Sequence, residues 1–316
     1  MNLLLLDAAA MGPLLEKIDV IEAVEGAFAA YGRGEATMPP KVYLDVPPHG
    51  DFRAMPAAMG GAASLKWVSV HAGNPERHGL PTVMAMLFYN DAATGRPLAV
   101  MDGTLITRER TAAAAAVATR HLARRGARTL GLVGCGGQAE PHLRLIARVV
   151  RPERVLLADL HRTHAEKLAA EMRGLPCEVV DTPAACGADV VTTLTASRQG
   201  FVRKEWIQPG AHINAMGADA AGKQELTADL LLAARVFVDD WAQAAHSGEI
   251  NVAHREGKLK AVAGTLPDVV CGKHPGRISD DEITIFDSTG LAIQDLAIAK
   301  AAYAKAAELD LATISL

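Results

Sequence analysis

The sequence predicts an α/β fold made of two different parts. From residue 113 to residue 293, segments with strand character alternate with helical segments, and the strands are apolar throughout. This alternation is typical of a parallel sheet covered by helices on both faces. Before residue 113, short strand-like runs follow one another closely, which favours a mixed or antiparallel sheet. We therefore expect a doubly wound parallel sheet over residues 113–293 and an α+β domain formed by residues 1–112 together with 294–316.

Composition and charge exclude several classes of protein. The chain has 316 residues, of which 50% are hydrophobic, so it can bury a sizeable core and is not largely disordered. Its formal net charge is −4, and its lysines and arginines are scattered along the chain. A nucleic-acid-binding protein would need a basic stripe, so we expect no nucleic-acid partner.

The cysteines and the apolar runs predict the compartment. The four cysteines have neither CxxC nor metal-ligand spacing, so we expect reduced thiols and no metal site. The N-terminal leucine run has no basic segment before it, and no apolar stretch reaches the roughly 18–20 residues that a membrane span needs. These observations predict a cytoplasmic protein with no membrane partner.

The first domain should contain a short strand at "NLLLL", one helix and a series of strands. Apolar residues at helical spacing predict a single helix that starts near residue 13 and is ended by Gly32 and Gly34. A hairpin follows later, with its turn at residues 90–95 and a return strand at 97–101. The strand-like runs between helix and turn are "KVYLDV", "DFRAMPA", "SLKWVSVHA" and "TVMAMLFYND".

After Gly103 an alanine-rich helix, "TRERTAAAAAVATRHLARRG", leads into the second domain. Thr107 is its candidate N-cap and Gly126 its candidate stop. The residues from 295 to 310 form a strong amphipathic helix, which we expect to pack on the first domain. The alternating segments between these two helices are the strands "TLGLVG", "RVLLADL", "CEVVD", "ADVVTTLT", "AHINAMG", "RVFVDD" and "TIFDSTG", and the helices "QAEPHLRLIARVV" and "THAEKLAAEM".

The stretch "GLVGCGGQAE" carries the clearest functional signal. Gly134, Gly136 and Ala139 match the G-x-G-x-x-A pattern between a strand and a helix, which is the dinucleotide-binding fingerprint of a Rossmann domain. The glycines allow a tight turn and close approach of a pyrophosphate, and the helix N-terminus attracts it. Asp159 follows the next strand, where an acid binds the ribose and favours NAD. Arg162 is close enough that NADP is not excluded.

Lysine and arginine residues in the first domain could act on a substrate. In a strand, Lys66 shares a face with Val68, and burial there would lower its pKa and suit it to acid–base work. The alternative is an edge lysine that reaches water. Arg110 lies in the first turn of the predicted alanine-rich helix, where it opposes the helix dipole, so it could serve as a ligand for an anion; the alternative is a surface residue paired with Glu109. Arg53 is a second candidate for binding a carboxylate.

Two loops after predicted strands add further candidates. Asp219 and Lys223 lie in the small-residue loop "GADAAGKQEL", and strand ends border the ligand crevice in a parallel sheet. Asp219 could exchange protons with a substrate amine, and Lys223 could meet a phosphate or carboxylate. The alternative is a helix cap and a solvated lysine. The stretch "TIFDSTG" offers Asp287, Ser288 and Thr289 to the same crevice.

With these motifs in one chain, the sequence resembles the ornithine cyclodeaminase/μ-crystallin family over nearly its whole length. Several ordered motifs of this length are far more specific than the glycine loop alone. The resemblance rests on "RAMPA", "LKWVSVHAGNPERHGLPTVMA", "ATGRPLAVMDG", "RTAAAAAVA", "GLVGCGGQAE", "HINAMGADAAGKQEL", "VDDWAQAAHSGEIN" and "EITIFDSTGLAIQDLA".

The resemblance implies a homodimeric enzyme with a Rossmann domain for the nicotinamide cofactor. Its N-terminal domain, joined by the C-terminal helix, would bind an amino-acid or imino-acid substrate and form the dimer. The resemblance implies that Lys66 and Asp219 are catalytic, and that Arg53, Lys66 and Arg110 bind the substrate. Around the cofactor it implies Thr82, Arg110, Thr111, Gly134, Gly136, Gly137, Gln138, Ala139, Asp159, Thr193, Met216, Lys223 and Ser288.

The resemblance also implies the chemistry. An L-amino acid loses the hydrogen on Cα as hydride, and the resulting imine is attacked either by water, giving oxidative deamination, or by the substrate's own distal amine, giving cyclodeamination. The stretches "HAGNP" and "PTVMA" resemble the branch that deaminates L-alanine. Ornithine cyclodeamination, NAD(P)H-dependent reduction of cyclic imines such as pyrroline-2-carboxylate, and a μ-crystallin-like binding role without turnover stay open as alternatives.

Overall fold

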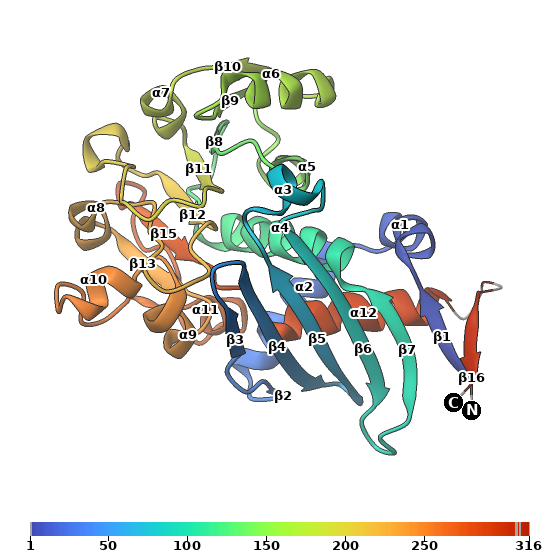
Figure 1. Cartoon of the computed structure of the whole chain (residues 1–316). Helices are drawn as coiled ribbons and strands as arrows, with labels where there is room; N and C mark the ends of the chain where they lie inside the picture. Colours follow the sequence, from blue (N-terminus) through green and yellow to red (C-terminus); the bar gives the residue numbers. More distant parts are fainter. Residues whose placement is uncertain (1, 307–308, 310, 316) are drawn as a thin grey trace. The chain divides into compact units, whose positions relative to one another are not determined.

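The computed structural model describes residues 2–306, 309 and 311–315. It divides into two compact units (Figure 1). The first unit comprises Met1–Arg110 and Leu291–Leu316, and the second comprises Thr111–Gly290. The boundaries therefore lie two or three residues before the predicted ones. Among the described residues, no helix is both long and apolar enough to cross a bilayer.

The first unit is built on a mixed sheet. Its strand order is β16-β1-β7-β6-β5-β4-β2, with β3 also paired to β4, and β1–β7 is its parallel pair. The strands are β1 (Asn2–Leu6), β2 (Ala36–Thr37), β3 (Val42–Val46), β4 (Gly50–Met59), β5 (Ala62–Val70), β6 (Val83–Asp91), β7 (Pro97–Asp102) and β16 (Thr313–Ser315).

Helices cover one face of this sheet. The C-terminal helix α12 (Ala292–Ala306) packs against β4, β5 and β6, and α2 (Val20–Gly32) packs against α12. In Figure 1 the red α12 runs across these strands. A third helix of this unit, α1 (Ala8–Glu16), also contacts α12. The short helix α3 is Asn74–His78.

The single helix predicted near the N-terminus is wrong, because the structure has two helices there. The chain leaves α1 at Lys17, and Asp19 caps the start of α2: its Oδ1 accepts the backbone N–H groups of Ile21 and Glu22 at 3.2 and 3.4 Å. An aspartate at an N-cap stabilises a new helix start by about 1 kcal/mol. Helical spacing alone could not show this break, since both helices bury apolar residues.

The alanine-rich helix α4 (Gly103–Leu122) starts one turn earlier than predicted. Asp102 Oδ1 accepts the N–H of Leu105 at 2.7 Å, so Asp102, not Thr107, occupies the capping position. The Thr107 hydroxyl instead donates to the carbonyl of Gly103 inside the helix. Arg110 therefore lies beyond the first turn, and the expected conflict with the helix dipole disappears. The helix ends before Gly126, which adopts a left-handed conformation in the turn that follows.

The second unit confirms the predicted doubly wound sheet. All strand pairs are parallel, in the order β10-β9-β8-β11-β12-β15-β13-β14. The strands are β8 (Thr129–Val133), β9 (Arg154–Ala158), β10 (Cys177–Val179), β11 (Val190–Thr193), β12 (His212–Ala215), β13 (Arg235–Val238), β14 (Gly264–Thr265) and β15 (Thr284–Asp287). The order changes direction between β8 and β11, and ligands of such sheets bind at the carboxyl ends of strands at this switch point.

The helices of the second unit are two predicted ones and several short ones. The predicted helices are α5 (Ala139–Val150) and α6 (Arg162–Glu171). Apolar strand residues such as Val191, Ile213 and Ile285 form a buried core with the surrounding segments. The helices too short for a periodic pattern are α7 (Thr182–Cys186), α8 (Ala228–Ala233), α9 (Trp241–Ser247), α10 (Asn251–Arg255), α11 (Leu266–Val270) and a 3-10 turn at Lys204–Trp206.

Candidate active site

Lys66 lies on the helix-covered face of β5, in the interior of the sheet. Its side chain is 1% exposed, and its strand pairs with β4 on one side and β6 on the other. The alternative of an edge lysine that reaches water is therefore wrong. Lys66 Nζ donates to Asp295 Oδ1 at 2.9 Å and to the Thr107 hydroxyl at 3.2 Å. A buried ammonium is costly unless it is paired, and Asp295 of α12 provides that pair.

Arg110 shares the same carboxylate. Arg110 Nε donates to Asp295 Oδ1 at 3.0 Å, and a terminal nitrogen donates to Gln294 Oε1 at 3.2 Å. Asp295 is 1% exposed, so one buried carboxylate lies between two cations. We call these residues the lysine cluster: Lys66, Thr107, Arg110, Gln294 and Asp295.

The lysine cluster changes the acidity of Lys66. The pKa of Lys66 is lowered to about 7, because burial and, to a smaller extent, the positive charge of Arg110 lower it more than Asp295 raises it. At neutral pH the amine is therefore present in both its charged and its neutral form. Such a group can donate or accept a proton, which an ordinary lysine with a pKa near 10.5 cannot do efficiently.

Three members of the lysine cluster are not identified by the sequence patterns. Thr107 has the residue type of a helix cap, and Gln294 and Asp295 lie at the start of a helical run. A signal was available, because Asp295 is a carboxylate in the apolar helical run "GLAIQDLAIA". A charge on the buried face of a helix needs a partner of opposite charge. Lys66, a positive charge on an apolar strand face, needs such a partner as well.

Arg53 lies on the same unit but already holds a carboxylate. Arg53 Nε donates to Asp51 Oδ1 at 2.6 Å and a terminal nitrogen donates to Oδ2 at 3.2 Å, while the guanidinium lies over the Tyr43 ring. Thr82 lies just before β6, where its carbonyl accepts the N–H of His71 at 2.8 Å. The roles of Arg53 and Thr82 with a substrate or cofactor stay predictions.

The glycine loop of the second unit connects β8 to α5. Gly134 has φ +99°, and a Cβ on it would lie 3.0 Å from the carbonyl of Leu194, so this position requires glycine. A Cβ on Gly136 or Gly137 would meet nothing within 4 Å, so the loop borders open space. Among the residues that the structure describes, no side chain caps the N-terminus of α5 at Gln138. Its N–H groups and the free space beside the loop fit a dinucleotide pyrophosphate.

Asp159 lies directly after β9, as a ribose-binding acid should. Its Oδ2 accepts the N–H of Cys135 at 2.7 Å, and its Oδ1 accepts the N–H of His161 at 2.8 Å. The carboxylate thus reaches the glycine loop itself. Arg162, the residue that kept NADP possible, donates to Glu166 at 2.9 Å on the surface of α6.

The ends of three neighbouring strands bring other predicted cofactor residues together. Met216 N donates to the carbonyl of Thr193, so the end of β12 is joined to the end of β11. Ser288 N donates to the carbonyl of Ala215 in the same way from β15, and the Ser288 hydroxyl is buried without a hydrogen-bond partner among the described residues. Thr111 lies in α4, outside this group.

Asp219 and Lys223 form an ion pair. Lys223 Nζ donates to Asp219 Oδ1 at 2.5 Å. No helix begins at Asp219, and the next one is α8, so the alternative of a helix cap is wrong. The pair lies in the loop after β12, on the same carboxyl edge of the sheet as the glycine loop.

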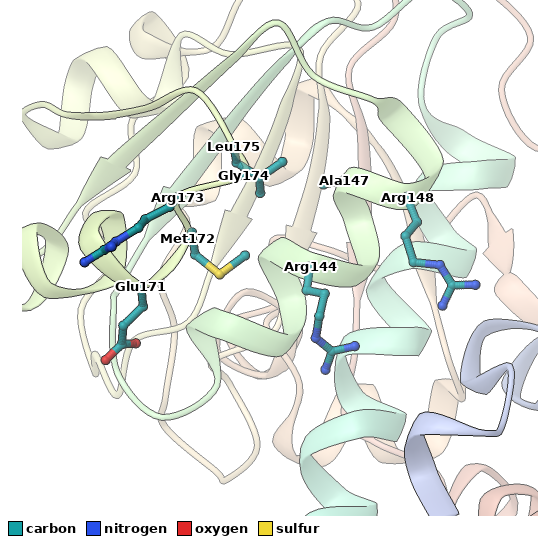
Figure 2. Close-up of a pocket in the computed structure, with 8 residues that line it drawn as sticks. All are labelled: Arg144, Ala147, Arg148, Glu171, Met172, Arg173, Gly174 and Leu175. Atoms are coloured by element: carbon teal, nitrogen blue, oxygen red, sulfur yellow. The ribbon is translucent and has the colours of Figure 1, made fainter. Parts of the chain in front are cut away.

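A surface pocket of the second unit contains none of these residues. It has a volume of about 380 Å³ and lies between α5 and the segment after α6. Figure 2 shows the guanidinium groups of Arg144, Arg148 and Arg173 pointing in different directions, away from Met172 and Leu175. Arg144 also pairs with Glu140 at 2.8 Å. Because the cations do not converge, the pocket is not a candidate site.

A doubly wound sheet with an open glycine loop, together with a buried lysine of lowered pKa in the other unit, defines an enzyme of the nicotinamide-dependent oxidoreductase class. Comparison with known proteins gives the family. The family model "Ornithine cyclodeaminase/mu-crystallin family" matches residues 2–310, and the chain belongs to this family.

Relatives with different activities match this chain over most of its length. The alanine dehydrogenase of Archaeoglobus fulgidus is 46% identical over 310 residues, 97% of this chain and 96% of the relative. The L-lysine cyclodeaminase of Streptomyces rapamycinicus is 39% identical over 87% of this chain and 82% of the relative. The iminosuccinate reductase of Paracoccus denitrificans is 38% identical and covers 89% of each chain.

Solved structures agree with the sequence comparison. An archaeal alanine dehydrogenase dimer with bound NAD has a TM-score of 0.96, with 45% identity and full coverage of both chains. The Δ(1)-pyrroline-2-carboxylate reductase of Thermococcus litoralis, in complex with NADH and L-proline, has a TM-score of 0.93 at 34% identity and covers 99% of this chain and 100% of that one.

Proposed function

We propose that this protein catalyses the NAD-dependent oxidative deamination of a small L-amino acid, L-alanine first of all. L-Alanine, NAD⁺ and water would give pyruvate, ammonium, NADH and a proton, and the reaction is reversible. The observation that carries the proposal is the lysine cluster, in which a buried lysine with a pKa of about 7 lies beside an arginine. The similarity to the A. fulgidus alanine dehydrogenase supports the choice of substrate.

In this proposal the second unit holds the nucleotide. The open glycine loop and the uncapped N-terminus of α5 bind the pyrophosphate. Asp159 accepts hydrogen bonds from the ribose, and its charge disfavours the 2′-phosphate of NADP. Bound NAD accepts the hydride from Cα of the amino acid, which becomes an imine. Further proposed contacts with the nucleotide come from Thr82, Arg110, Thr111, Gln138, Ala139, Thr193, Met216, Lys223 and Ser288.

The first unit binds the substrate carboxylate. When Lys66 is protonated, the lysine cluster has two positive charges against the single negative charge of Asp295. The net positive charge attracts an anion, and its burial strengthens the interaction with a carboxylate. Arg53 is the weaker ligand of the two arginines because Asp51 alone balances its charge through two hydrogen bonds, whereas Arg110 shares Asp295 with Lys66.

Lys66 and Asp219 carry out the proton transfers of the proposed reaction. When water adds to the imine, Lys66 polarises the oxygen of the developing carbinol, and in its neutral form it can accept the hydroxyl proton as the C–N bond breaks, because its amine titrates near neutral pH. Asp219, with Lys223 beside it, exchanges protons with the attacking water and with the departing amine. Ammonia then leaves, and the 2-oxo acid remains.

Cyclodeamination is the second candidate function. The 39% identity to an L-lysine cyclodeaminase favours it specifically. In that reaction the distal amine of L-ornithine replaces water as nucleophile and the α-nitrogen leaves as ammonia. The hydride then returns to the cyclic imine, and L-proline forms without net NADH. The same lysine cluster would bind the carboxylate in both reactions.

We also propose a homodimer that forms through the open face of the first unit's sheet. The strand register pairs Leu65 with Phe88 and Trp67 with Met86 on the face opposite Lys66. These four side chains are 37–52% exposed, so they form an apolar surface that a second copy would cover. The archaeal alanine dehydrogenase with the same fold is a dimer.

A cytoplasmic location completes the proposal. All four cysteines are free. Burial raises the pKa of Cys135 and of Cys186 to about 12, so these two thiols resist oxidation. Free cysteines are typical of a reducing compartment.

An absorbance assay with the purified protein and NAD tests the proposed function. NADH formation with L-alanine, together with pyruvate and ammonium in equal amounts, is the expected result. Proline and ammonia from L-ornithine without net NADH would replace it by cyclodeamination. Oxidation of NADH or NADPH by pyrroline-2-carboxylate, with no reaction of either amino acid, would identify an imine reductase. Nucleotide binding without turnover of any of these would leave a binding protein.

A further inference from the structure

The loop that carries Asp219 and Lys223, residues 217–226, is held by buried side chains and not by a helix. At its start, Gly217 N donates to Glu225 Oε2 at 3.0 Å. In its middle, Gly222 N donates to Asn251 Oδ1 at 2.9 Å, and Asn251 Nδ2 donates to the carbonyl of Lys223 at 2.8 Å. The position of the proposed catalytic carboxylate therefore depends on these anchors.

Glu225 joins the two ends of the loop to strand β11. Besides the N–H of Gly217, its carboxylate accepts the hydroxyl of Thr193 at 2.6 Å, the hydroxyl of Thr195 at 2.7 Å and the N–H of Thr195 at 2.6 Å. The fit is tight, because a Cβ on Gly217 would lie 2.2 Å from the Thr195 carbonyl and 2.6 Å from the Glu225 carboxylate.

Glu249 holds Glu225 in turn. Its Oε1 accepts the backbone N–H of Glu225 at 2.8 Å and that of Leu226 at 2.6 Å. Glu249 is fully buried, and its own N–H donates to Asp287 Oδ1 at the end of β15. A chain of contacts thus runs from β15 through Glu249 to the loop.

We propose that Glu249 is the positioning residue for the loop that carries Asp219. Its Oε1 accepts the backbone N–H groups of Glu225 and Leu226, and it thereby holds Glu225 where the Glu225 carboxylate reaches the end of β11. The proposal rests on the proposed function only where it expects an effect on catalysis. Its structural part concerns residues 217–226 whatever reaction the protein performs.

The acceptor oxygen of Glu249 decides which variants test this role. Its carboxylate faces two others, Glu225 on the loop and Asp287 on β15. The pKa of Glu249 is raised well above its ordinary value, first by burial and then by the charges of Glu225 and Asp287. Among the described residues, Glu249 Oε2 has no hydrogen-bond partner, so the contacts with the loop are made by Oε1. Glutamine keeps an oxygen that can accept the two N–H groups, whereas leucine removes the acceptor.

The experiment compares Glu249→Gln and Glu249→Leu with the full-length wild type. In Glu249→Leu, we expect amide hydrogen exchange of Glu225 and Leu226 to become about tenfold faster or more, and kcat for L-alanine to fall by about tenfold or more. Glu249→Gln should restore both slow exchange and kcat. Asp189→Asn is the control, because Asp189 is a buried acceptor for the backbone of Arg128 and Thr129 and does not touch the loop.

The outcomes separate the two proposals. Slow exchange and normal kcat in Glu249→Leu would overturn the positioning role. Loss of kcat in Glu249→Gln equal to that in Glu249→Leu would also overturn it, because the acceptor would not be what matters. If the wild type turns over no amino acid or imine, the proposed function fails, and hydrogen exchange at residues 217–226 still decides whether Glu249 holds the loop.

Discussion

Lys66 and Asp295 are 229 residues apart in the sequence, and their side chains form a buried ion pair at 2.8 Å. The pair joins strand β5 of the first unit's sheet to the C-terminal helix α12. The last helix is therefore part of the chemistry of the first unit, and not only a cover for its sheet. Replacing Asp295 alone by leucine would leave the charge of Lys66 buried without its carboxylate, which is strongly destabilising.

Replacing Lys66 by methionine tests its catalytic role. Lys66→Met keeps the length of the side chain but removes the amine, so we expect kcat for alanine oxidation to fall by about 100-fold or more. Nucleotide affinity, measured by quenching of protein fluorescence, should change little because the glycine loop is in the other unit. Lys300→Met on α12 is the control, since Lys300 lies at the surface and donates to the Gly60 carbonyl. Equal activity of both variants would contradict the assignment.

The lowered pKa of Lys66 also predicts how stability depends on pH. The folded protein has a pKa of about 7 at Lys66, below the ordinary value of 10.5, so between these values the unfolded chain binds more protons. The contribution of Lys66 to the free energy of unfolding is therefore complete above about pH 10.5 and is lost as the pH falls to about 7.

Chemical denaturation of the wild type and Lys66→Met at several pH values measures this contribution. We expect the wild type to gain stability relative to the variant, by a few kcal/mol, as the pH rises from about 7 toward 10. A difference that does not vary with pH would mean that Lys66 keeps an ordinary pKa in the folded protein.

Arg110 should control substrate affinity. Because Arg110 and Lys66 share Asp295, removing the guanidinium leaves the cluster without net positive charge. Arg110→Ala should raise KM for L-alanine by about 10- to 100-fold, the effect of losing a charge-assisted hydrogen bond. Arg53→Ala should raise it less, because Asp51 already engages Arg53. The reverse order in steady-state kinetics would make Arg53 the principal carboxylate ligand.

Asp159 should set the choice between NAD and NADP. Its carboxylate would repel a 2′-phosphate, so Asp159→Ser should lower the ratio of kcat/KM for NAD to that for NADP by about tenfold or more. The variant also loses the hydrogen bond to Cys135 N, so both nucleotides are expected to bind more weakly. Glu171→Ser at the C-terminal end of α6 is the control, because it leaves Arg162 paired with Glu166. An unchanged ratio would place ribose recognition elsewhere.

The sequence predicted the second unit better than the first, for a physical reason. Parallel strands with helices on both faces are apolar throughout, and the glycine loop must have its residues in a fixed order, so local patterns were sufficient.

The lysine cluster depends on a contact between β5 and α12 that no local pattern specifies. The sequence identifies Lys66 and Arg110 as candidate site residues because each is a charge at an unfavourable position. It does not identify Asp295, which lies in an apolar helical run. The Asp219 loop was found, but its buried anchors Glu225 and Glu249 were not, because a buried carboxylate cannot be told from a surface one by residue type alone.

The open face of the first sheet gives the last prediction. Trp67 and Phe88 project from neighbouring strands on the side that α12 does not cover, and Phe52 stacks on Trp67 at 5.4 Å between ring centroids. If a second copy covers this face, a negative charge on it will separate the copies. Sedimentation velocity should show Trp67→Glu as a monomer and the wild type as a dimer at the same concentration. Ile278→Glu, at a 64% exposed apolar residue of the second unit, should stay dimeric. A dimeric Trp67→Glu would place the interface on another surface.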